Sequence, residues 1–419
     1  MITVTFSKPD SIKFSFNTIA IDLPEFEEFA EALIGQLEVE ISEEKEIAGL
    51  ASKISEDASF TLKFDEIEQI SEQLLPELKQ KASEFLGIPV ADGIKLQYPE
   101  LKDFKKLKGK KVFCADNARE YVDDLFNSVA NEDLKQIAKL IKQDTAKFLV
   151  YSTYAKMYIS KISTTYGDYL SNAVYLNKFI LSSYPQIILY KQGAPYEPNF
   201  DNVRAGYLGA LKMTILEEMI HSVQENLQKI NKEAVIQVNS INEELAKIIL
   251  DLDDKTATEL SEYLQLHPVP DDFPIAKRAN LFFMLNPDHF ILEQLGPDVM
   301  TYSRVEVDPK ISKFVPNLLD IYKRWLIPIQ THHAAFTTME GMAEFSVQNI
   351  LKDDKDFQNY LATFMGTDFS SYQVRKSMGK DFTQAIYEKF GKKTFKMLIE
   401  NPPSTRELKE PQLYLKRAQ

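Results

Sequence analysis

The stretch ILEEMIHSVQ, from Ile215 to Gln224, decides how this sequence is interpreted, because it combines two glutamates and a histidine within a helical pattern. Glu217 and His221 are four residues apart, so on a helix both side chains lie on one face and can bind one metal ion. Glu218 is turned from them by about 100° and is placed to act as a general base. The apolar periodicity predicts a metal-binding helix over residues 211–230.

The segment TTMEGMAEF, from Thr337 to Phe345, offers a third metal ligand in Glu340. If this part of the chain is one continuous helix, His333 lies two turns before Glu340, on the same face. His333 would then be a further ligand or a proton donor, and the alternative is a histidine bonded within the helix packing. His332 is turned about 100° away, and we expect it to be exposed.

These two segments and the C-terminal part resemble gluzincins, metallopeptidases of the zincin clan, over roughly residues 140–415. E-E-x-x-H at Glu217 to His221 stands where the family has H-E-x-x-H, and the residues from Glu340 to Ala343 match its E-G-x-A motif. Three further matches follow in the family's order near the C-terminus. They are a G-x-x-F helix at Gly379 to Phe382, a P-P-S-T segment at Pro402 to Thr405, and P-x-x-Y-L at Pro411 to Leu415.

The resemblance implies an α+β, zincin-like metallopeptidase fold, in which a small strand-bearing half precedes a mainly helical half. It implies a hydrolase that cleaves peptide bonds in a peptide or protein substrate. Zinc would be bound by Glu217, His221 and Glu340. Glu218 would take a proton from the attacking water, and His333 would assist.

The chain departs from the family at Glu217, where a carboxylate replaces the first histidine ligand. Two carboxylates and one imidazole would neutralise a divalent ion and weaken it as a Lewis acid, so iron and manganese are alternatives to zinc. Two other functions therefore stay open. One is a zincin-fold binding or scaffold protein without metal, and the other is a carboxylate-rich site for a metal other than zinc.

The hydrophobic pattern suggests three parts: an N-terminal α+β domain at 1–115, the first zincin half at 116–266, and a helical C-terminal half at 267–419. The pattern within these parts predicts several local elements. We expect strands near the N-terminus, helices at 24–37, 66–85 and 243–266, helical structure over 116–165, strands at 173–181 and 185–192, an exposed Lys-rich loop at 105–111, and an irregular crossing over 267–310.

Composition limits the class of protein. The formal net charge of −13 opposes binding to nucleic acid. The chain has no apolar stretch of about 18 residues and no secretory signal pattern at its start, so we expect neither a membrane span nor secretion by that route. The single cysteine, Cys114, cannot form an internal disulfide, and a cytoplasmic location is therefore expected.

Overall fold

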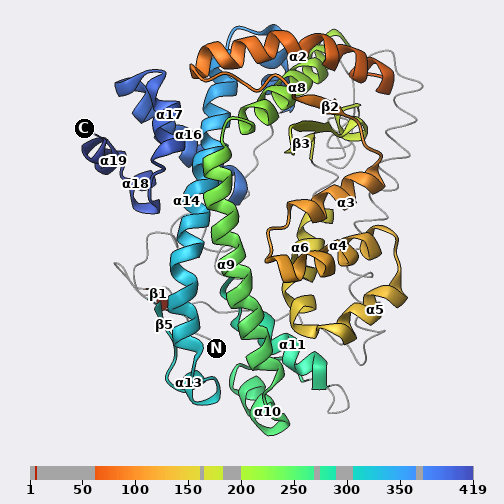
Figure 1. Cartoon of the computed structure of the whole chain (residues 1–419), viewed down its shortest axis with the longest axis vertical. Helices are drawn as coiled ribbons and strands as arrows, with labels where there is room; N and C mark the ends of the chain where they lie inside the picture. Colours follow the sequence, from red (N-terminus) through yellow and green to blue (C-terminus); the bar gives the residue numbers. More distant parts are fainter. Residues whose placement is uncertain are drawn as a thin grey trace.

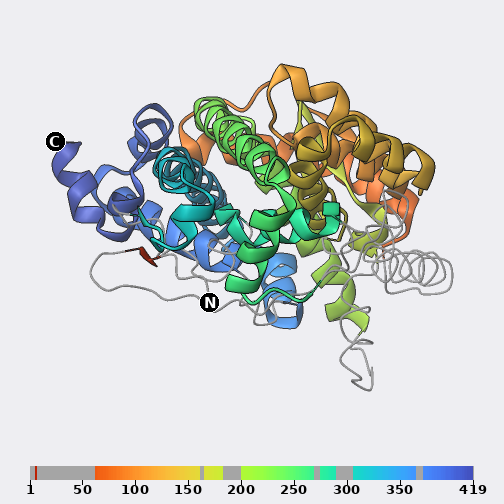
Figure 2. The same cartoon turned by 90° about the horizontal axis from the view of Figure 1, so that it is seen from below.

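The computed structural model describes residues 5–6, 62–160, 165–182, 200–268, 274–288, 305–364 and 371–418. Two long helices, α9 (Glu225–Leu250) and α14 (Leu318–Ile350), run side by side through the molecule (Figures 1 and 2). They are antiparallel, because Leu227 at the start of α9 packs against Met339 late in α14. At the opposite end, Glu244 accepts hydrogen bonds of 2.6 and 2.9 Å from the Arg324 guanidinium.

The two large hydrophobic clusters of the described residues lie along this pair, and α14 belongs to both. Trp325, in the first half of α14, is buried in one of them, which we call the lower cluster, and Met342, in the second half, is buried in the other, the upper cluster. These names follow the positions of the helices of each cluster in Figure 1. The other helices of the lower cluster are α3 (Leu101–Lys111), α4 (Asp116–Ala130), α5 (Leu134–Gln143), α6 (Thr145–Ser160), α10 (Asp254–Tyr263), α11 (Pro274–Leu285) and α13 (Ile311–Phe314). Those of the upper cluster are α2 (Phe64–Leu86), α8 (Phe200–His221), α15 (Lys355–Phe364), α16 (Ser371–Phe390), α17 (Lys393–Glu400), α18 (Thr405–Lys409) and α19 (Pro411–Arg417).

A three-stranded sheet in the order β2-β4-β3 lies beside α8. Its strands are β2 (Lys95–Gln97), β3 (Gly167–Leu170) and β4 (Ala173–Leu176). β4 pairs in parallel with β2 and antiparallel with β3, and the positive φ angles of Ser171 (52°) and Asn172 (61°) form the tight turn between β3 and β4. A separate pair joins β1 (Thr5–Phe6) to β5 (Val305–Glu306) in antiparallel register.

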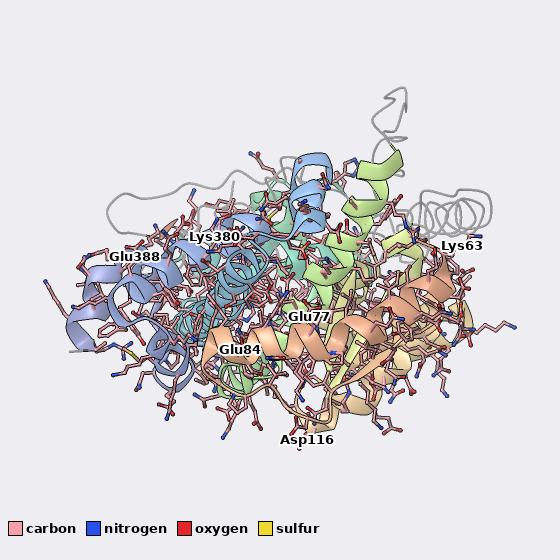
Figure 3. The ribbon with its side chains drawn as sticks, turned by 90° about the horizontal axis from the view of Figure 1, so that it is seen from above. Lys63, Glu77, Glu84, Asp116, Lys380 and Glu388 are labelled. Atoms are coloured by element: carbon pink, nitrogen blue, oxygen red, sulfur yellow. The ribbon has the colours of Figure 1, made fainter. Side chains whose placement is uncertain are left out.

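Helix α2 shows how the amphipathic pattern directs packing, and it confirms the helix predicted at 66–85. Ile67, Leu78 and Leu86 are buried in the upper cluster. Glu77 and Glu84, seven residues apart, are exposed on the opposite side of the helix (Figure 3). The helix therefore covers the upper cluster with one face and meets solvent with the other.

Helices α14 and α16 approach each other closely at two glycines. A Cβ atom on Gly379 would lie 2.9 Å from the Cα of Gly341, and closer still to the carbonyl oxygen of Thr337. Real side chains do not tolerate such contacts, so both positions need glycine for the backbones to touch. This contact fixes how α16 presents its side chains to α14.

The metal-binding helix predicted over 211–230 is wrong in its bounds. Helix α8 begins at Phe200 and ends at His221, and α9 begins at Glu225 after a short non-helical link. The helix predicted at 243–266 is likewise divided between the end of α9 and α10.

Three further local predictions were also corrected. The Lys-rich segment at 105–111 is part of helix α3 and not an exposed loop. The run at 173–181 is a strand only to Leu176 and is helical from Lys178. The crossing at 267–310 contains helix α11.

Helices α4, α5 and α6 confirm the helical structure predicted over 116–165 as far as Ser160, and residues 161–164 lie outside the described residues. The helix predicted at 24–37, the strand at 185–192 and the N-terminal strands other than β1 lie outside the described residues.

At the level of fold class, the mainly helical structure with a small sheet confirms α+β, and the zincin-like fold stays a prediction. None of the helices in the described ranges combines the length and the apolar composition of a membrane-spanning segment.

Candidate metal centre

Three side chains predicted as metal ligands converge from two helices. Glu217 and His221 lie in the last turns of α8, and Glu340 lies on α14. One ligand atom from each lies within 4.8 Å of the other two, and no other such group occurs within the described ranges. Ligand atoms around a tetrahedral ion with bonds of about 2 Å are about 3.3 Å apart, so small side-chain movements would complete the coordination.

His221 is held in the orientation and tautomer that a metal ligand requires. Its Nδ1 is 2.8 Å from Oε1 of Gln224, and Nε2 of Gln224 donates a 3.0 Å hydrogen bond to the carbonyl oxygen of Met339. The carbonyl can only accept, so the amide NH2 must face it and the amide oxygen must face the histidine. Nδ1 therefore carries the proton, and Nε2 of the neutral ring keeps a lone pair for an ion.

Three carboxylates, those of Glu217, Glu218 and Glu340, lie close enough to His221 to affect its charge. The Nε2 atom of His221 is 3.8 Å from Oε1 of Glu340. Burial lowers the pKa of His221, but the carboxylates of Glu340, Glu218 and Glu217 outweigh burial and raise it above its ordinary value. Protonation of His221 would therefore compensate part of the negative charge in the metal-free protein, and a divalent cation would displace that proton.

Glu218, the predicted base, lies where α8 meets strand β3. A Cβ atom on Gly167 would be 3.5 Å from Cγ of Glu218 and only 2.6 Å from Cγ2 of Thr214, so glycine lets the strand approach the helix. Burial raises the pKa of Glu218, and so do the charges of Glu217 and Glu340, although His221 and Lys111 act against them. A carboxylate with a raised pKa is better able to hold a proton taken from water.

The basic segment that the sequence suggested to be exposed contributes to the surroundings of Glu218. Lys108 and Lys111 of α3 both form ion pairs with the buried Asp168 of β3, the residue after Gly167. Burial lowers the pKa of Lys108 to about 8, and the nearby Glu218 acts in the opposite direction. These lysines thus bind α3 to β3 and bring positive charge near the carboxylates.

Lys376 of α16 was not predicted from the sequence. Its ammonium forms an ion pair with Oε1 of Glu217 and lies 3.3 Å from Oε2 of Glu344. Gln224 was missed as well, although its position one turn after His221 was a usable signal. Lys376 left no such signal, because it follows Glu217 by more than 150 residues.

His333 is buried on α14 and is not one of the three grouped side chains. Its Nδ1 is 2.9 Å from Nη1 of Arg375, and a guanidinium can only donate, so Nδ1 accepts and Nε2 carries the proton. That Nε2 is buried and has no hydrogen-bond partner among the described residues. Burial and then the neighbouring His332 and Arg375 hold the pKa of His333 well below its ordinary value. It is a neutral hydrogen-bond donor.

His332 was expected to be exposed, and this is wrong. Its ring is part-buried beside α9, where Nδ1 contacts the side-chain oxygen of Asn231. Burial, together with the charge of Arg375, lowers its pKa to about 3. Through its contact with Asn231, His332 links α14 to α9.

Comparisons of the chain with protein-family models, curated proteins and solved structures found no match.

Proposed function

We propose that this protein is a metal-dependent, gluzincin-like hydrolase that cleaves peptide bonds. The supporting observation is the convergence of Glu217, His221 and Glu340, together with the contact through which Gln224 leaves Nε2 of His221 available. Zinc accepts histidine nitrogen and carboxylate oxygen as ligands, so this donor set fits it. When bound, such an ion polarises a carbonyl group and lowers the pKa of water.

The other residues have defined tasks in this proposal. Glu218 takes a proton from the attacking water and passes it to the leaving amine, as its raised pKa favours. His333, two turns before Glu340, offers its Nε2 proton as a hydrogen bond to an oxygen of the substrate. Arg375 orients His333 by donating to Nδ1.

The proposal is tested by metal analysis and peptide hydrolysis with three proteins. We expect the purified wild-type protein to contain one equivalent of zinc and to cleave members of a mixed peptide library. Glu218→Gln should retain the metal and lose hydrolysis, since it keeps the shape of the side chain without the base. Glu340→Ala should lose both. A wild-type protein without stoichiometric metal would refute the proposal.

A binding or scaffold protein without metal is the second candidate, and one observation favours it. The ammonium of Lys376 already supplies a positive charge to Glu217. This candidate predicts no bound metal and unchanged thermal stability in chelator. If the metal analysis finds iron instead of zinc, the carboxylate-rich non-zinc centre is supported.

A further inference from the structure

Lys376 connects the candidate metal centre to a third helix. Its Nζ atom pairs with Glu217 on α8 and lies 3.3 Å from Oε2 of Glu344 on α14. The side chains of Lys376, Glu217 and Glu344 are only 10%, 13% and 14% exposed, so solvent screens this network weakly. Among the described residues, Lys376 is the cation that forms an ion pair with Glu217.

The position of Lys376 is set by the packing of α16 on α14. Gly379, three residues later, touches α14 at Gly341, the residue after Glu340. Arg375, the residue before Lys376, contacts His333 on the same helix. Contacts on both sides of Lys376 therefore hold its ammonium beside the carboxylates.

The charge of the ligand set explains what this ammonium does. Two carboxylates and a neutral imidazole would cancel the charge of a divalent ion and leave it a weak electrophile. An ammonium on Oε1 of Glu217 withdraws negative charge from that carboxylate, and one of its two oxygens is engaged. Glu217 would then coordinate an ion through one oxygen and donate less negative charge to it than a free carboxylate does.

We propose that Lys376 is a positioning residue for the metal centre, holding Glu217 to one coordinating oxygen and preserving the net positive charge of the bound ion. The inference rests on the proposed function, because it concerns the ion that Glu217, His221 and Glu340 would bind. It assigns to Lys376 a role in the metal's Lewis acidity.

A purely structural role for Lys376 makes the opposite prediction for metal binding. If the lysine only joined α8, α14 and α16, its removal would loosen the ligands and weaken binding. If it counteracts the charge of Glu217, its removal makes the site more negative and strengthens binding of a cation. The sign of the change in affinity thus separates the two roles.

The test is calorimetric titration of the full chain with Zn²⁺ at pH 7. We expect Lys376→Met to bind Zn²⁺ at least tenfold more tightly than wild type, and Lys376→Arg to stay within threefold of wild type. Lys376→Gln keeps an N–H donor without the charge, so it should also bind more tightly if the methionine variant fails to fold.

Lys380, one turn later on α16, provides the matched control (Figure 3). Lys380→Met removes the same charge from the same helix, at a residue that forms no ion pair with Glu217, and should leave the affinity within threefold of wild type. Unchanged or weaker binding by both neutral Lys376 variants overturns the inference, as does an equal gain in Lys380→Met. If wild type binds no Zn²⁺, the proposed function itself fails, which is a different result.

Discussion

At the scale of single residues, Gln224 fixes the ring of His221, so its substitution should affect metal binding. Gln224→Ala removes the hydrogen bond to Nδ1, so the ring can rotate and change tautomer. Removal of such a partner commonly weakens metal binding about 10- to 100-fold. We expect that loss in a Zn²⁺ competition titration, with the secondary structure unchanged by circular dichroism.

Gln228 offers a matched control for this experiment. Its Nε2 donates a 2.7 Å hydrogen bond to the backbone carbonyl of His221 and leaves the ring untouched. Gln228→Ala should therefore bind Zn²⁺ within about threefold of wild type, a small effect for an N–H bond to a backbone carbonyl. Equal losses in both variants would show that the link between α8 and α9 matters, and not the ring.

The raised pKa of His221 predicts how metal binding depends on pH. An ion requires the neutral ring, so protons compete with it below the folded-state pKa, which lies above the ordinary 6.5. Zn²⁺ affinity should rise about tenfold per pH unit up to that pKa and then level off. Competition titrations between pH 6 and 8.5 measure this, and an affinity independent of pH would remove His221 from the ligand set.

The metal-free protein should show the opposite trend in stability. Because the folded state raises the pKa of His221, the protonated ring stabilises the fold fully below pH 6.5, and this contribution is lost as pH rises through the folded-state value. Thermal unfolding of the apo protein and of His221→Gln across this range isolates the contribution. The variant should lack this part of the pH dependence.

At the scale of elements, the close contact between α14 and α16 should contribute to the free energy of unfolding. Gly379→Ala places a methyl group against the backbone of α14, and overpacking of this kind costs about 1–3 kcal/mol or more. Denaturant unfolding should show this loss of free energy. Gly93→Ala is the control, since a Cβ atom there meets nothing within 4 Å and should change stability little.

The elements also show what the sequence could predict and what it could not. The four-residue spacing placed Glu217 and His221 on one helix face, because helical periodicity is a local property. The E-G-x-A match singled out Glu340, and its ligand atom lies within 4.8 Å of theirs in the structure. The non-helical link after His221 could not be predicted, because apolar residues such as Val223 and Leu227 continue the helical periodicity across it.

The basic helix α3 was misjudged for a different reason. Two of its lysines, Lys108 and Lys111, pair with the buried Asp168, a partner about 60 residues later in the chain. Lys376 escaped for the same reason. Charge pairs formed by tertiary folding leave no mark in local spacing.

At the scale of the whole molecule, α14 should make unfolding cooperative. It contributes buried residues to both hydrophobic clusters, so neither cluster can lose its packing alone. We expect one calorimetric transition for the described part of the chain. Two separate transitions would show that the clusters unfold independently.

Metal binding should stabilise the folded state of the whole protein. An ion that binds only the folded state adds about 2.7 kcal/mol at a free concentration one hundred times Kd. Zn²⁺ should therefore raise the melting temperature of the wild-type protein, and chelator should reverse the increase. Glu340→Ala should show neither change.

The continuity of α14 has a geometric consequence for Glu340. In a continuous helix each residue is rotated by about 100° from the one before it, so the orientation of residues in the lower cluster fixes the orientation of residues at the candidate metal centre. Trp325 and Ile329 anchor one half, so deleting a single residue between Gln330 and His333 would turn Glu340 to another side of the helix. The packing of the lower cluster, remote from the ligands, thus determines which side of α14 carries Glu340 and whether that side faces His221.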